Sequence, residues 1–173
     1  LWITRDGVSS NADTLLTFIQ RVDSFGFSRE KFYYSMLKED LQRVRVLDFD
    51  SLESSRNTAD KVFARLEYYL TKAFLRYTEG QRFGFMNPFQ AFNRLDKRND
   101  DTIHVSYRSL YGWNTSLPGS NYLATACSVI KGDGEKFTDF LAKSKPHNPL
   151  YNKYVAELNK TNDKAYRRLL LCN

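Results

Sequence analysis

The longest run of helical hydrophobic spacing in the chain lies between Asn57 and Glu79. Its large apolar residues follow one another at intervals of three and four, which places them on one side of an α-helix and on no single face of a strand. They are Val62, Phe63, Leu66, Tyr69, Leu70, Ala73, Phe74 and Tyr77. Side chains this bulky need neighbours on at least two sides, so the pattern predicts a central helix enclosed by others. We expect Asn57 or Thr58 to cap its start and Gly80 to end it.

Shorter amphipathic segments lie on both sides of this central stretch. Their ranges are 10–26, 28–47, 120–130, 134–146, 148–160 and 162–173. We expect the second segment to be broken near 38–40, where its charged residues gather. In the fifth segment, Asn148 and Pro149 form a specific helix start, and the spacing predicts that Leu150, Tyr154, Val155 and Leu158 point inward.

Three stretches lack this periodicity. The first eight residues contain a turn signal, Asp6-Gly7, and one large anchor, Trp2, which we interpret as a packing residue. The polar stretch 48–56 is expected to be a connector. A charge cluster followed by alternating apolar residues predicts a hairpin or irregular excursion at 95–119. The sequence therefore predicts an all-α, single-domain helical bundle of about seven helices over residues 1–173, built around the central amphipathic helix.

Composition limits the class of protein. A chain of 173 residues suits one domain, and its 15% aromatic content favours an aromatic-rich helical core. Two cysteines exclude a disulfide-dense scaffold, and the sequence contains no apolar run of the ~20 residues that span a bilayer. The net charge of +6 attracts polyanions without specificity, but it is scattered and predicts no specific nucleic-acid partner.

Two groups of residues are candidates for a partner-binding surface. The first is a basic stripe on the central helix, which falls within roughly 60° of arc and comprises Lys61, Arg65, Lys72 and Arg76. The ordinary interpretation is a solvated helix face, and the sharper one is a contact surface for an anionic partner. The second group is Tyr111 and Trp113 in the excursion, because aromatic faces stack on sugars and peptides.

No catalytic, metal or cofactor motif emerges from the sequence. His104 and His147 stand at unrelated positions, so no metal-ligand spacing is present, and no nucleotide-binding loop or dinucleotide fingerprint occurs. Cys127 has no supporting motif, and we expect its helix to bury it as a small apolar residue. We therefore expect no metal and no cofactor, although an enzyme that uses Cys127 is a third hypothesis, which rapid labelling of that thiol would favour.

The chain resembles the helical N-terminal scaffold domain of large L,D-transpeptidases, periplasmic enzymes that cross-link peptidoglycan with a cysteine nucleophile. Leu1-Trp2, the break at Gly26-Phe27 and the segment Lys145 to Tyr151 match the family pattern. The central helix matches it through Leu66, Glu67, Leu70, Thr71, Ala73 and Phe74. The catalytic stretch of the family has no counterpart here, and Cys127 does not inherit its role.

The resemblance implies a non-catalytic scaffold module that belongs to a longer chain and is located in the periplasm or cell envelope. Its implied partners are the catalytic domain of the same parent chain, peptidoglycan or another envelope protein. The alternative is a free-standing basic helical adaptor that binds an anionic partner. Steep loss of DNA binding with added salt would favour that alternative.

Overall fold

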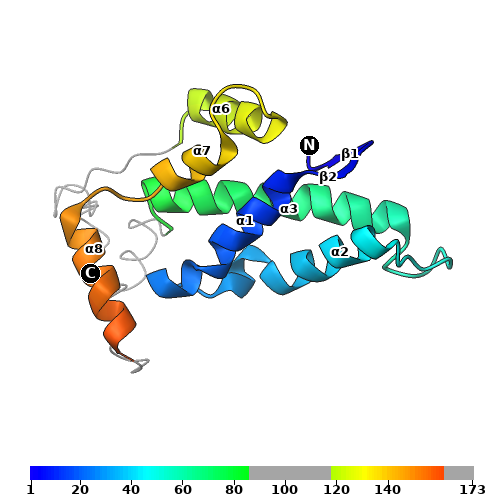
Figure 1. Cartoon of the computed structure of the whole chain (residues 1–173), viewed down its shortest axis with the longest axis horizontal. Helices are drawn as coiled ribbons and strands as arrows, with labels where there is room; N and C mark the ends of the chain where they lie inside the picture. The colour runs from blue at the N-terminus through cyan, green and yellow to red at the C-terminus, as the bar shows by residue number, and fades with distance from the viewer. Residues whose placement is uncertain (86–117, 162–173) are drawn as a thin grey trace, which may run out of the picture.

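The protein is a mostly helical single domain with a minor two-stranded hairpin (Figure 1). The computed structural model describes residues 1–85 and 118–161. Within these residues the strands are β1 Ile3–Thr4 and β2 Gly7–Val8, and the 3-10 helices are η1 Val22–Phe25 and η2 Arg29–Phe32. The α-helices are α1 Ser10–Gln20, α2 Tyr34–Val46, α3 Ala59–Phe83, α6 Ser120–Lys131, α7 Phe137–Lys143 and α8 Pro149–Lys160. The predicted all-α fold is confirmed.

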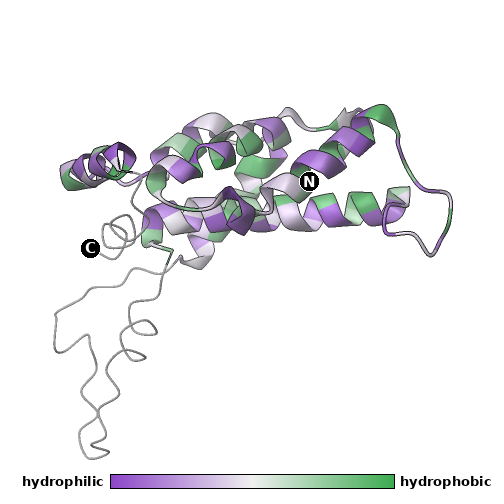
Figure 2. Cartoon of the chain, turned by 90° about the horizontal axis from the view of Figure 1, so that it is seen from below, coloured by the Kyte–Doolittle hydropathy of each residue, from purple (hydrophilic) through white to green (hydrophobic). Residues whose placement is uncertain are grey.

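The predicted central helix is α3, which is 25 residues long. In Figure 1, α2 runs along one side of α3 while α6 and α7 lie on the other. The predicted apolar stripe is buried except for Phe63 and Tyr69, which are half-buried at its edges. Figure 2 shows hydrophobic and hydrophilic positions alternating around the helices, as expected for helices that each bury one face.

The predicted end of α3 at Gly80 is wrong, because the helix continues to Phe83 and stops at Gly84, whose φ is 99°. Gly80 is buried inside the helix. A side chain at this position would overlap the ring of Phe85, which also contacts the rings of Phe27 and Phe32 at centroid distances of 4.2 and 5.9 Å. The glycine therefore provides room for an aromatic contact and does not act as a helix stop.

The break predicted near 38–40 is also wrong, because α2 is continuous there and the interruption comes at Tyr33. Ser28 caps η2 by accepting a hydrogen bond from the Glu30 amide, at 3.3 Å. Tyr33 then adopts a left-handed conformation, with φ 61° and ψ 27°, before α2 begins. Asp40 lies on the inward face of α2, where the helix tolerates it because Arg65 neutralises its charge.

Trp2 is the packing residue that the sequence predicts, with no exposed surface. The hairpin pairs Ile3 with Val8 and Thr4 with Gly7, so the Asp6-Gly7 turn signal is confirmed. The indole packs edge-to-face on Phe74 of α3 and Phe137 of α7, at 6.1 and 5.7 Å between centroids. This aromatic cluster joins the N-terminal segment to both helices.

Two predictions about the later helices need correction. Cys127 is exposed, because the buried positions of α6 are Ala126, Val129 and Ile130 and the cysteine falls outside the face that they form. In α8, Leu158 is buried and Val155 is half-buried, but Leu150 and Tyr154 are exposed. The side chain of Asn148 accepts a hydrogen bond from the Leu150 amide at 2.9 Å, so the predicted start of α8 is confirmed.

Some predicted elements lie wholly or largely outside the described residues. These are the excursion at 95–119, of which only the last two positions are described, and the final segment 162–173. The sequence predicts about seven helices, and the described ranges contain six α-helices. Within the same ranges, no helix is both long enough and apolar enough to cross a membrane.

Candidate functional site

The basic stripe of α3 divides into residues that face α2 and its connector and residues that face the solvent. Arg65 donates two hydrogen bonds of 2.6 Å to the buried carboxylate of Asp40, one from Nε and one from Nη2. It also donates to the Arg56 carbonyl at 2.9 Å. The hydrogen bonds with Asp40 raise the pKa of Arg65. Its guanidinium therefore joins α3 to α2 and to the connector.

Lys61 lies one turn before Arg65 and also contacts the connector. Its ammonium donates to the carbonyl oxygens of Glu53 and Ser55. The connector 48–56 contains no helix or strand, so these hydrogen bonds from Lys61 and Arg65 restrict a segment that lacks its own backbone ladder. This half of the predicted stripe stabilises the fold.

Lys72 lies among three tyrosine rings on the outer surface of η2, α2 and α3. Its Nζ is 5.3 Å from the ring centroids of Tyr33 and Tyr68 and 5.8 Å from that of Tyr69. Such distances allow cation–π attraction. The nearby hydroxyls of Tyr33 and Tyr68 raise the pKa of Lys72, so its charge is retained. We call Tyr33, Tyr68, Tyr69 and Lys72 the Lys72 cluster.

Arg76 extends the cluster along α3 by one turn. Its guanidinium carbon lies 5.7 Å from the centroid of the buried Phe32 ring. Arg76 and Lys72 are both exposed, and with the residues that the structure describes neither forms an ion pair. This half of the predicted stripe combines exposed positive charge with aromatic surface.

Glu67 and Thr71 form a clamp for the N-terminal segment that sequence reasoning did not predict. The Glu67 carboxylate accepts hydrogen bonds from the amides of Trp2 and Ile3, at 2.7 and 2.8 Å. Thr71 accepts one from the Trp2 indole at 2.9 Å. Burial of Glu67 acts to raise its pKa, but these hydrogen bonds outweigh burial and lower it. The sequence signal that could have predicted this clamp is the spacing of Glu67 and Thr71, a carboxylate and a hydroxyl four residues apart beside the apolar stripe.

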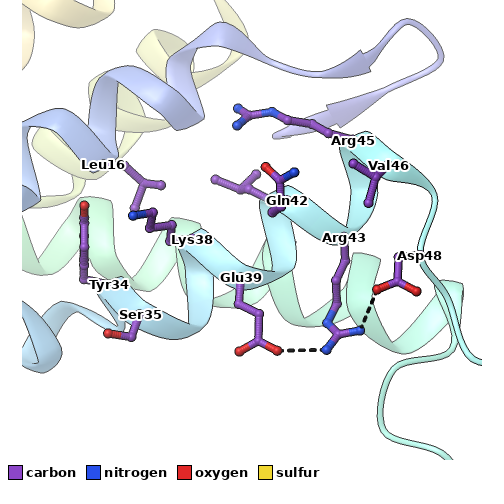
Figure 3. A pocket seen from close by; sticks show the side chains of 11 residues that line it. Leu16, Tyr34, Ser35, Lys38, Glu39, Gln42, Arg43, Arg45, Val46 and Asp48 are labelled. Atoms are coloured by element: carbon purple, nitrogen blue, oxygen red, sulfur yellow. Dashed lines mark hydrogen bonds and ion pairs between the residues drawn. The ribbon is translucent and has the colours of Figure 1, made fainter.

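A groove of about 680 Å³ lies between α1 and α2 (Figure 3). Leu16, Tyr34 and Val46 contribute apolar surface to it. Along its rim, Arg43 bridges Glu39 at 2.8 Å and Asp48 at 3.4 Å, as the dashed lines in Figure 3 show. Arg45 of the same helix pairs with Asp13 of α1. These ion pairs are exposed on at least one side and contribute little energy, so the groove is a mixed surface without a concentrated charge.

The predicted aromatic pair Tyr111 and Trp113 lies outside the described residues, as do His104 and Cys172. Of the remaining nucleophile and ligand candidates, Cys127 and His147 are both exposed. In residues 1–85 and 118–161, no group of three or more His, Cys, Asp or Glu side chains could bind a metal ion. Among the described residues of the two predicted groups, Lys72 lies against tyrosine rings and Arg76 lies against the ring of Phe32.

Comparison with known proteins gives one family. Neither the curated proteins nor the solved structures contain a match to the chain. A family model described as "Scaffold domain" matches residues 1–158, which covers every helix that the structure describes except the last two residues of α8. On this match, the chain belongs to the Scaffold domain family.

Proposed function

We propose that this scaffold domain is the non-catalytic module of an L,D-transpeptidase, a cell-envelope enzyme that cross-links peptidoglycan. The coarser statement, that the chain is a scaffold domain, follows from the family match. The finer assignment, to a cell-wall enzyme, is supported by the resemblance in the central helix and at the N-terminus. Under this proposal the chain positions the catalytic domain of its own parent and performs no chemistry.

One observation carries the proposal: the residues of the resemblance are the residues that build the fold. Leu66, Leu70, Ala73 and Phe74 are fully buried in the core. Glu67 and Thr71 bind the segment that contains Trp2, which belongs to the same resemblance. A chance likeness between amphipathic helices would match apolar spacing alone. A match that includes both partners of a clamp supports a shared architecture.

The charge distribution favours this proposal over a free-standing adaptor. An adaptor for a polyanion needs several unoccupied cations on one face. Lys61 and Arg65, half of the predicted stripe, are instead bound to carbonyl groups and to Asp40. The remaining cations, Lys72 and Arg76, are too few for a broad electrostatic contact.

The proposal is tested first by the reading frame that encodes the chain. We expect the same frame to encode a domain with a histidine and a later cysteine in the transpeptidase arrangement. That catalytic domain, produced separately, should bind the purified scaffold chain in a pull-down. A complete frame without a cysteine transpeptidase domain would contradict the proposal, and so would a catalytic domain that never associates with the scaffold.

A further inference from the structure

The Lys72 cluster exposes aromatic surface where a helix would ordinarily present polar side chains. Tyr68 is 58% exposed and packs against Tyr69, with ring centroids 4.9 Å apart. Tyr69 in turn lies 4.6 Å from Tyr33. An aromatic side chain with this exposure gains little from folding. Tyr33 and Tyr69 are half-buried against the core, so the exposed ring that stability alone leaves unexplained is that of Tyr68.

The cluster is held in one arrangement before any ligand arrives. Lys72 lies within 5.8 Å of all three ring centroids, so its ammonium favours this grouping of the rings. Tyr33 reaches Tyr69 from a left-handed backbone conformation that a tyrosine adopts only under constraint from its surroundings. Its carbonyl accepts the hydrogen bond from the Leu37 amide that starts α2, at 2.9 Å. Preorganisation of this kind lowers the entropy lost on binding.

The charges of the surface define the ligand. Lys72 and Arg76 stand four residues apart on the same helix face, and each lies against an aromatic ring with no ion-pair partner among the described residues. A suitable ligand presents a carboxylate to these cations and an apolar face to Tyr68. A pyranose ring offers such a face through its axial C–H groups.

We propose that the Lys72 cluster and Arg76 bind a carboxylate-bearing glycan, with a sugar ring on Tyr68 and a carboxylate on Lys72 and Arg76. This assignment rests on the proposed function, because the polymer that a cell-wall enzyme meets is a glycan whose peptide stems carry carboxylates. The scaffold would then contact the glycan strand directly as well as its own catalytic domain.

The ring geometry disfavours nucleic acid as the ligand. Proteins that bind single strands without sequence preference stack successive bases on aromatic rings along a positively charged groove. Here the Tyr68 and Tyr69 rings meet at 85° and the Tyr69 and Tyr33 rings at 57°. The cluster therefore offers one outer ring, Tyr68, for stacking and no series of parallel rings.

The test is co-sedimentation of the purified chain with insoluble peptidoglycan that retains its peptide stems. The double variant Tyr68→Ala with Lys72→Ala should bind about tenfold more weakly than the wild type, which corresponds to about 1.4 kcal/mol. The matched control is Tyr154→Ala with Lys153→Ala, an exposed tyrosine and lysine on α8. The control should bind as the wild type does. All three proteins should stay folded, with unfolding temperatures within about 4 °C of one another, because the altered side chains are exposed and only cation–π and ring contacts are lost.

Two further probes identify the ligand class. Chitin, which lacks carboxylates, should bind more weakly than peptidoglycan, and a thymidine oligomer should bind more weakly still. Equal binding by the wild type and the Tyr68→Ala, Lys72→Ala variant would overturn the inference, and so would tighter binding of the oligomer. If the wild type does not bind peptidoglycan at all, the glycan site is refuted while the scaffold role stands, because the pull-down with the catalytic domain tests that role separately.

Discussion

Asp40 and Arg65 join α2 to α3 through two hydrogen bonds of 2.6 Å, from Nε to Oδ2 and from Nη2 to Oδ1. The Asp40 side chain is 3% exposed and that of Arg65 is 23% exposed. The carboxylate has thus lost its water and depends on the guanidinium for compensation. Arg65, which helical spacing placed on a candidate binding surface, therefore holds two helices together.

This relationship predicts that Arg65→Met destabilises the protein by about 3 to 5 kcal/mol, because it leaves a buried carboxylate unpaired. Urea unfolding measures the loss. Arg76→Met is the matched control from the same stripe, and it should cost less than about 1 kcal/mol because only a cation–π contact is removed. Equal stability of Arg65→Met and the wild type would show that Asp40 needs no partner. The double variant Asp40→Asn with Arg65→Met should be more stable than Arg65→Met alone.

The aromatic cluster around Trp2 predicts a large loss on truncation. Trp2→Ala removes a fully buried side chain that packs on Phe74 and Phe137 and should cost about 3 to 5 kcal/mol. Trp2→Phe retains most of the volume but gives up the hydrogen bond to Thr71, so its cost should be smaller. Thermal unfolding of both variants checks the order. If the Trp2→Ala variant unfolds at the same temperature as the wild type, the N-terminal segment does not contribute to the core.

The lowered pKa of Glu67 predicts a pH dependence of stability. A carboxylate whose pKa is lower in the folded state stabilises the fold at pH values above its unfolded pKa of about 4.3. That stabilisation is lost as the pH falls through the folded pKa. Glu67→Gln should therefore be less stable than the wild type at pH 7, and the difference should shrink below about pH 4. Urea unfolding at both pH values measures it, and a difference that stays constant with pH would contradict the clamp.

At Gly80 we expect substitution by alanine to destabilise the helix, which is the reverse of the usual effect on stability. Alanine is normally favoured over glycine inside a helix by up to about 1 kcal/mol. Gly80→Ala would instead push the methyl group into the Phe85 ring, which Phe27 and Phe32 contact. Overpacking of this kind typically costs about 1 to 3 kcal/mol, so the net effect should be destabilising. In a Phe85→Ala background, the same substitution should become neutral or stabilising. A double-mutant cycle measured by urea unfolding tests whether the cost of Gly80→Ala depends on the Phe85 ring.

The fold was largely predictable because the helices follow their hydrophobic spacing. The inward positions of α3 and α7 emerge from the three-four rhythm, and local capping chemistry predicts the starts of η2 and α8. Two of the errors, the helix end at Gly80 and the break near 38–40, come from tertiary contacts. The Phe85 ring requires glycine at 80, Arg65 allows a charge at Asp40, and neither contact has a signature in the local sequence.

The candidate site was predictable only in part, for a similar reason. Helical spacing places Lys61, Arg65, Lys72 and Arg76 on one side of α3 but does not show what each cation meets. The connector and α2 occupy the first two, while tyrosines surround Lys72. Glu67 was missed as a clamp because its partners are backbone amides 64 and 65 residues away.

The proposed role in a wall cross-linking enzyme is tested most directly in cells, by measuring the cross-links of the wall. Two forms of the protein encoded by the complete reading frame are compared, one intact and one carrying Trp2→Ala to destabilise this domain. Both forms must be present at equal levels. The scaffold role predicts that cross-links made by the cysteine transpeptidase, measured by muropeptide analysis, fall with the destabilised domain although every catalytic residue is intact. An unchanged yield of those cross-links would contradict it.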